Sequence, residues 1–238
     1  MKKIYISLLC AAAISISAPI HVNAQQQQNA EKYLSTLDDV DQVDLPQADW
    51  QNNSHRNVYI LVDKSSSVGN KKTREYIERI LAAFADDVPL SNNGVRISLS
   101  IFADTFALIV PLTADKKLLY EGISSIAAEN NDTSASYMCA GISFIDDLIS
   151  YESQDDSLSL SDIVIISDGL ATDQMCAKLY AQGMLDNTTT IRISSILAAV
   201  GCESAPDFMR DLASDPKRYF GNDYSLFVKE MAQLGAQQ

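Results

Sequence analysis

The sequence predicts an α/β fold, in which a doubly wound, mostly parallel sheet with one antiparallel edge strand carries helices on both faces. Residues 58–62 and 163–166 are unbroken apolar runs, typical of strands that are buried on both faces of a parallel sheet. Segments with helical spacing alternate with the strands, as β–α–β crossovers require. The strand predicted at 106–110 follows the one at 95–102 through a tight connection, which favours an antiparallel pair.

The remaining elements follow from the period of the apolar residues. In the first helical segment Ile77, Ile80 and Phe84 fall on one face, and the sequence Asn92-Asn93-Gly94 then predicts a turn. Along the chain we expect strands at 58–62, 95–102, 106–110, 163–166 and 190–200, and helices at 73–88, 116–127, 138–149, 174–185, 206–213 and 224–234.

The first residues have the pattern of a secretory signal peptide. Lys2 and Lys3 are followed by an apolar stretch at 4–16 and by the small-residue cleavage site Val22-Asn23-Ala24. The apolar stretch is too short to cross a bilayer, and no later segment reaches the ~18 apolar residues that a membrane-spanning helix needs. We expect a secreted protein, periplasmic if bacterial, with a signal peptide at 1–24, a polar, acidic flexible leader at 25–56 and one domain at 57–236.

The charge balance argues against nucleic acid as a partner. The chain has 18 basic and 31 acidic residues, a net charge of −13, which becomes −15 once the two lysines of the signal peptide are removed. Such a field repels phosphate backbones and anionic lipid surfaces and attracts cations. His55 is the only histidine after the signal peptide, which argues against a Ser-His-Asp or Cys-His hydrolase.

Oxygen-bearing side chains follow the two buried strands. Asp63, Ser65 and Ser67 come at the end of the first, and Asp168, followed by Gly169, comes at the end of the later one. Ligand sites of open parallel sheets form at these carboxyl ends. Two carboxylates and several hydroxyls make a hard, all-oxygen site that suits Mg²⁺ or Mn²⁺. Alternatively, the serines only cap the next helix and Asp168 is a turn residue.

These residues resemble a known family. Val-Asp-Lys-Ser-Ser-Ser-Val at 62–68 and Ile-Ser-Asp-Gly at 166–169 are similar to the von Willebrand factor type A domain. That family carries a metal-ion-dependent adhesion site, written D-x-S-x-S, then a Thr in a middle loop, then an Asp before Gly. The resemblance covers about 57–236. It implies a Rossmann-like, doubly wound sheet, in agreement with the fold predicted above.

The resemblance also implies the metal ligands. Asp63, Ser65 and Ser67 would supply oxygens of the first loop, and Asp168 would act directly or through water. The middle-loop hydroxyl is Ser136 by its spacing from the next helix, with Thr133 as the alternative. The long side chain of Lys64 is expected to point to solvent.

The cysteines offer at most one internal disulfide in the mature chain, because Cys139, Cys176 and Cys202 are an odd number. Cys176 is predicted to follow the Asp168 loop and Cys202 the next strand, both on the metal-bearing face. We therefore expect these two to pair, and three free thiols is the alternative. No C-x-x-C pair is present, which argues against a thiolate zinc site.

The function implied by the resemblance is binding rather than catalysis. An ion held by one or two carboxylates and neutral oxygens keeps positive charge and an open position, which a Glu or Asp of a partner protein can fill. We expect Mg²⁺, or Mn²⁺ or Ca²⁺, as the ion. The alternatives are a structural or assembly subunit with a non-functional metal site and, last, a metal-dependent hydrolase.

Overall fold

The computed structural model describes residues 56–92, 94–128, 133–152, 160–200 and 203–221. The predicted signal peptide, all but the last residue of the predicted leader and the helix predicted at 224–234 lie outside these ranges. Within them, no helix is both long and apolar enough to span a membrane.

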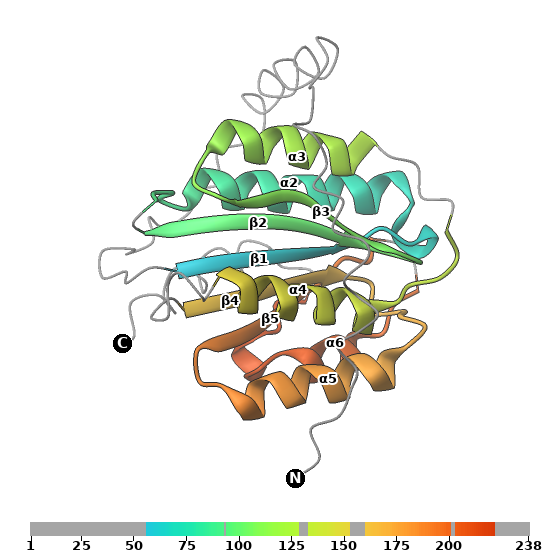
Figure 1. Ribbon diagram of the computed structural model, residues 1–238. Coiled ribbons are helices and arrows are strands. Elements are labelled where there is room, and N and C mark those ends of the chain that lie inside the picture. Colours follow the sequence, from blue (N-terminus) through green and yellow to red (C-terminus); the bar gives the residue numbers. More distant parts are fainter. Residues whose placement is uncertain (1–55, 93, 129–132, 153–159, 201–202, 222–238) are drawn as a thin grey trace. The chain divides into compact units, whose positions relative to one another are not determined.

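The described residues form one five-stranded sheet with the order β3-β2-β1-β4-β5 (Figure 1). β1 pairs in parallel with both β2 and β4, and β4 pairs in parallel with β5, whereas β2 and β3 are antiparallel. The predicted fold class is therefore confirmed. The strands are β1 (Arg56–Asp63), β2 (Val95–Phe102), β3 (Phe106–Thr113), β4 (Leu160–Ser167) and β5 (Ile191–Leu197).

Each predicted helix within the described ranges is present, with ends that differ by up to three residues. The largest difference at an N-terminus is at the first helix, which begins at Lys71 rather than at residue 73. The Asn70 side chain accepts a hydrogen bond from the backbone N–H of Thr73 at 2.9 Å and caps this helix. The helices are α2 (Lys71–Asp87), α3 (Lys116–Ala128), α4 (Met138–Glu152), α5 (Gln174–Asn187) and α6 (Pro206–Leu212), with 3₁₀ turns η1 (Ser66–Val68) and η2 (Pro216–Arg218).

The sheet separates two hydrophobic cores. The helices α2 and α3 pack on one face, and α4, α5 and α6 pack on the other (Figure 1). Side chains alternate between the faces along a strand, so Val58 and Ile60 of β1 enter the first core while Tyr59 and Leu61 enter the second. Because both faces are covered, residues 58–62 of β1 and 163–166 of β4 are continuous apolar runs, and these runs predict the two strands from the sequence.

A buried ion cluster lies near the amino ends of β1 and β4. Arg56 Nε donates to Asp162 Oδ2 at 2.5 Å, and Arg218 Nη1 of η2 donates to Asp162 Oδ1 at 2.9 Å. Burial opposes ionisation of Asp162, but the two guanidinium groups outweigh it and hold the pKa of this carboxyl below its usual range. The cluster links β1, β4 and η2.

The opposite, carboxyl ends of the same strands bring the predicted site residues together. Val62 of β1 is paired with Ile166 of β4 in the parallel register. The next residues, Asp63 and Ser167, therefore end the two strands side by side. Asp168 follows Ser167 directly, and Ser65 follows Asp63 after one intervening residue, both in the connecting loops.

Candidate metal centre

The Asp63 carboxylate is the centre of the site. It is fully buried at the end of β1 and accepts three hydrogen bonds. Its Oδ1 accepts from the backbone N–H of Ser65 at 2.9 Å, and its Oδ2 accepts from the hydroxyls of Ser167 at 2.6 Å and Ser136 at 3.3 Å. One carboxylate thus joins the first loop, the middle loop and the end of β4.

The environment of Asp63 disfavours its negative charge. Burial raises the pKa of the Asp63 carboxyl above its usual value, and the neighbouring Asp168 carboxylate adds to the increase. Hydrogen bonds from Ser167 and Ser65 act in the opposite direction. Two nearby carboxylates in a buried position are the electrostatic arrangement that a bound cation relieves.

Ser65 and Ser67 turn their hydroxyls toward each other, with 3.0 Å between the two Oγ atoms. The N-cap of α2 is Asn70 rather than either serine, and the Ser65 side chain makes no capping hydrogen bond at η1. The alternative in which these serines only cap a helix is therefore not what the structure has. Both hydroxyls remain on the loop that carries Asp63.

Asp168 is fully buried at the start of the loop that follows β4. Its Oδ1 accepts from the backbone N–H of Leu170 at 2.9 Å, whereas its Oδ2 is buried without a hydrogen-bond partner. Gly169 has φ +82°, and a Cβ there would lie 2.7 Å from the carbonyl oxygen of Ala205. A glycine is thus required at 169 for the turn that positions the Asp168 side chain. A cation bound at the unpartnered Oδ2 of Asp168 would compensate the buried negative charge.

The middle loop presents both candidate hydroxyls. Ser136 is buried and reaches Asp63 directly, whereas Thr133 accepts a hydrogen bond from the backbone N–H of Ser66 with its carbonyl oxygen at 2.8 Å. The Thr133 hydroxyl is buried without a hydrogen-bond partner. Ser136 is therefore in contact with Asp63, and Thr133 is tied to the same first loop through its backbone.

Lys64 does not point to solvent, so that expectation is wrong. The side chain is 6% exposed, and its ammonium donates to the carbonyl oxygen of Ile126 at 2.5 Å. Ile126 lies in the last turn of α3, where free carbonyl groups and the helix dipole favour a cation. The positive charge is thus directed into the α2–α3 side of the sheet and holds the first loop against α3.

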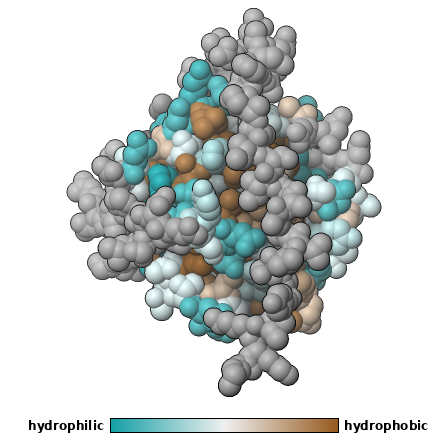
Figure 2. Space-filling view, viewed as in Figure 1, coloured by the Kyte–Doolittle hydropathy of each residue, from teal (hydrophilic) through white to brown (hydrophobic). Residues whose placement is uncertain are grey.

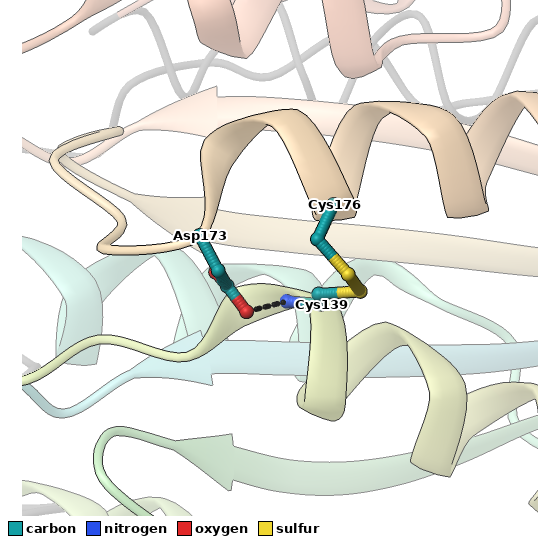
Figure 3. Close-up of a disulfide and its surroundings, with 3 residues drawn as sticks. All are labelled: Cys139, Asp173 and Cys176. Atoms are coloured by element: carbon teal, nitrogen blue, oxygen red, sulfur yellow. Dashed lines mark hydrogen bonds between the residues drawn. A yellow bond between two sulfur atoms is a disulfide. The ribbon is translucent and has the colours of Figure 1, made fainter.

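The predicted disulfide between Cys176 and Cys202 is also wrong, since Cys176 is bonded to Cys139 instead. The two Cα atoms are 5.6 Å apart because α4 and α5 pack side by side on one face of the sheet (Figure 3). Cys202 lies outside the described residues. Cys176 does follow the Asp168 loop, as predicted, but the first turn of α4 lies beside it and brings Cys139 within bonding distance.

Sequence reasoning missed Ser167 as a residue of the site. Its hydroxyl donates to Asp63 and accepts from the backbone N–H of Gly169 at 2.9 Å, so it bridges the two carboxylate-bearing strand ends. The signal for it is the parallel register of β1 and β4: each strand leads into a loop with a site carboxylate, and the register places Asp63 beside the residue before Asp168.

The donor set fits a divalent cation. It combines two carboxylates with the hydroxyls of several serines, and hard oxygens of this kind are the ligands of Mg²⁺ and Mn²⁺. In the part of the chain that the structure describes, no three Asp, Glu, His or Cys side chains gather into a metal cluster, so hydroxyls would have to complete the shell. The buried Asp168 Oδ2 without a partner is the observation that favours a bound ion.

Residues 58–170 match the profile of the family described as the von Willebrand factor type A domain. The chain contains a von Willebrand factor type A domain. The matched range begins in β1 and ends just past Asp168, so it includes Asp63, Ser136 and Asp168. The resemblance to this family that was seen in the sequence is thereby confirmed over residues 58–170. No curated protein sequence matches the chain.

Solved structures share the fold of this type A domain. Manganese-loaded TRAP protein of Plasmodium vivax has a TM-score of 0.65 and 17% identity, over 74% of this chain and 71% of that one. Proximal thread matrix protein 1 from the mussel byssus, with a zinc-occupied MIDAS motif, has a TM-score of 0.61 and 13% identity, over 77% of this chain and 47% of that one. The domain thus spans about half of the mussel protein.

A bacterial structure matches over nearly its whole length. The vWF domain of the type V pili tip protein Mfa5 from Porphyromonas gingivalis has a TM-score of 0.59 and 13% identity, over 78% of this chain and 97% of that one. At these identities the likeness establishes the fold that the chain shares with the three proteins.

Proposed function

We propose that this chain is a secreted, non-enzymatic binding module that captures an acidic residue of a partner protein through a divalent cation. The cation is Mg²⁺ in this proposal, with Mn²⁺ or Ca²⁺ able to replace it. The side chains that hold it are Asp63, Ser65, Ser67, Ser136 and Asp168. When bound, the ion supplies a positive charge with a vacant position.

One observation carries the proposal. Asp63 accepts a hydrogen bond from the Ser136 hydroxyl, while the neighbouring Asp168 has a buried carboxylate oxygen without a hydrogen-bond partner. An uncompensated buried carboxylate oxygen is costly unless an ion or a donor meets it. Asp63 offers the ion one carboxylate, the serines offer neutral hydroxyls, and Asp168 acts directly or through water, so the ion keeps positive charge and an open position. Water or a carboxylate of another protein then completes the shell.

The surface beside the site supports a protein as the ligand. Tyr137, which directly follows Ser136, is 43% exposed, and Met175 near the start of α5 is 71% exposed. Aromatic residues and Met are enriched in protein–protein interfaces. Figure 2 shows hydrophobic residues interspersed among hydrophilic ones over one described face of the molecule. A partner could therefore combine a carboxylate on the ion with apolar contacts around it.

The related structures are consistent with this proposal. TRAP is manganese-loaded, the mussel protein has zinc in its MIDAS motif, and Mfa5 is a pilus tip protein. Secretion rests on the signal-peptide pattern at 1–24. The non-enzymatic character rests on the absence of any histidine among the site residues described above and on the type A domain itself.

Metal binding is tested by titrating the purified mature chain with MgCl₂ and MnCl₂ in a calorimeter. We expect one site, lost in Asp168→Ala. Asp147→Asn is the matched control, because Asp147 is an exposed carboxylate on α4 away from the site and its removal changes net charge equally. Equal binding by all three proteins, or none by the wild type, would contradict the proposal.

The acidic partner is tested with a displayed random-peptide library selected in Mg²⁺. We expect selected peptides to contain Asp or Glu, to dissociate in EDTA, and to lose binding when that residue becomes Asn or Gln. Peptides that stay bound in EDTA, or to Asp63→Ala, would exclude capture through the ion. Turnover of phosphoester or peptide substrates by the metal-loaded chain would instead indicate a hydrolase.

A further inference from the structure

Two helices that follow different metal loops are joined by a covalent bond and by a carboxylate. The disulfide connects Cys139 in the first turn of α4 with Cys176 in the first turn of α5 (Figure 3). Beside it, Asp173 Oδ2 accepts a hydrogen bond from the backbone N–H of Cys139 at 3.0 Å. The N-cap and the first turn of α5 thus hold the start of α4 in two ways.

The loops themselves are tied together at the same place. The backbone N–H of Thr172 donates to the carbonyl oxygen of Ser136 at 2.8 Å, and the backbone N–H of Ser136 donates to the Thr172 hydroxyl at 3.2 Å. Ser136 comes just before α4, and Asp168 begins the loop that leads through Thr172 to α5. Any separation of α4 from α5 would therefore separate Ser136 from Asp168.

Metal affinity depends on how well such separations are fixed in advance. A ligand oxygen that is free to move must be ordered when the ion binds, and the lost freedom reduces affinity. Groups that orient ligands without contacting the metal usually change metal affinity about 10- to 100-fold when they are removed.

We propose that the Cys139–Cys176 disulfide and the Asp173 carboxylate are positioning groups that set the affinity of the metal site by fixing Ser136 relative to Asp168. This inference rests on the proposed function, because it concerns the same ion. It extends that function by assigning a role to three residues that contact no predicted ligand atom. It also makes the oxidised chain the form with high metal affinity.

The test compares metal affinity rather than stability, because a disulfide with a purely structural role would change only the stability of the fold. The mature chain carrying Cys202→Ser serves as the reference, so that the remaining thiols cannot exchange with Cys202. Cys176→Ser is added to break the disulfide. Calorimetric titration with MnCl₂, at a temperature where circular dichroism finds both proteins folded, should give a Kd about tenfold higher in the variant.

A matched control separates loosening of the site from general loss of stability. Ile149→Val removes one buried methyl group from the far end of α4, and it should lower the melting temperature while leaving the MnCl₂ Kd unchanged. If Cys176→Ser behaves in the same way, the disulfide is only a structural staple and the inference is wrong. If the reference protein binds no metal at all, the proposed function fails first, which is a different result.

Asp173 is tested with a conservative pair. Asp173→Asn keeps an oxygen that can accept from the N–H of Cys139, whereas Asp173→Ala removes it. We expect the Asn variant to retain the MnCl₂ Kd within about twofold and the Ala variant to weaken it about tenfold. Equal weakening in both variants would mean that the charge of Asp173 acts on the ion, and would overturn its assignment as a positioning group.

Discussion

The Ser167 hydroxyl donates a 2.6 Å hydrogen bond to Oδ2 of Asp63, across the boundary between β1 and β4. It also accepts from the backbone N–H of Gly169, the residue after Asp168. The Ser167 side chain therefore helps to fix the position of the Asp63 carboxylate relative to the loop that carries Asp168.

Ser167→Ala should weaken metal binding without disrupting the fold. Ser167 orients Asp63 without being one of the proposed ligands, and removal of such a group usually weakens metal binding about 10- to 100-fold, so the Kd for MnCl₂ should rise at least about tenfold. Ser161→Ala removes a buried hydroxyl from the amino end of the same strand and should leave the Kd unchanged. Calorimetry on both variants makes the comparison, and equal Kd values would remove Ser167 from the site.

Gly169→Ala should destabilise the domain by at least about 1–2 kcal/mol, because φ is +82° and the new Cβ would lie 2.7 Å from the Ala205 carbonyl oxygen. Gly183→Ala is the matched control. Gly183 is within α5 and nothing lies within 4 Å of the added Cβ, so this change should stabilise by about 0.5–1 kcal/mol. Urea unfolding of both variants measures the difference, which should have opposite signs.

Acid should destabilise the protein through Asp162. Its pKa is held below the usual range by Arg56 and Arg218, so the native state binds fewer protons than the unfolded state at low pH. The contribution is fully present above the unfolded pKa of about 3.9 and is lost as pH falls through the lower, folded value. Urea unfolding between pH 6 and pH 3 should follow this decline.

Asp162→Asn tests the same cluster at neutral pH. Removing one partner leaves buried guanidinium groups uncompensated, which costs about 3–5 kcal/mol. The melting temperature at pH 7 should fall, and its dependence on pH below 5 should become weaker than in the wild type. An unchanged acid response in the variant would mean that other carboxylates dominate it.

Metal should protect the folded chain against heat. At a concentration of 100 times Kd, an ion that binds only the native state adds about 2.7 kcal/mol to the free energy of unfolding. The melting temperature should therefore rise with MgCl₂ in the wild type and not in Asp168→Ala. A rise of the same size in Asp168→Ala would indicate binding elsewhere on this acidic chain.

The sequence by itself determined the α/β class, the positions of the strands and helices, and the two loops that carry Asp63 and Asp168. These features are local. Buried parallel strands need continuous apolar runs, amphipathic helices repeat every three to four residues, and a motif at a strand's carboxyl end must lie at the edge of the sheet.

Only the tertiary structure decided which distant side chains meet. Whether Cys176 bonds to Cys139 depends on the packing of α4 against α5, and whether Lys64 is buried depends on where α3 ends. The contact of Ser167 with Asp63 depends on the register between two strands. Such relations are fixed by the relative placement of whole elements, and residue periodicity along one segment contains no information about it.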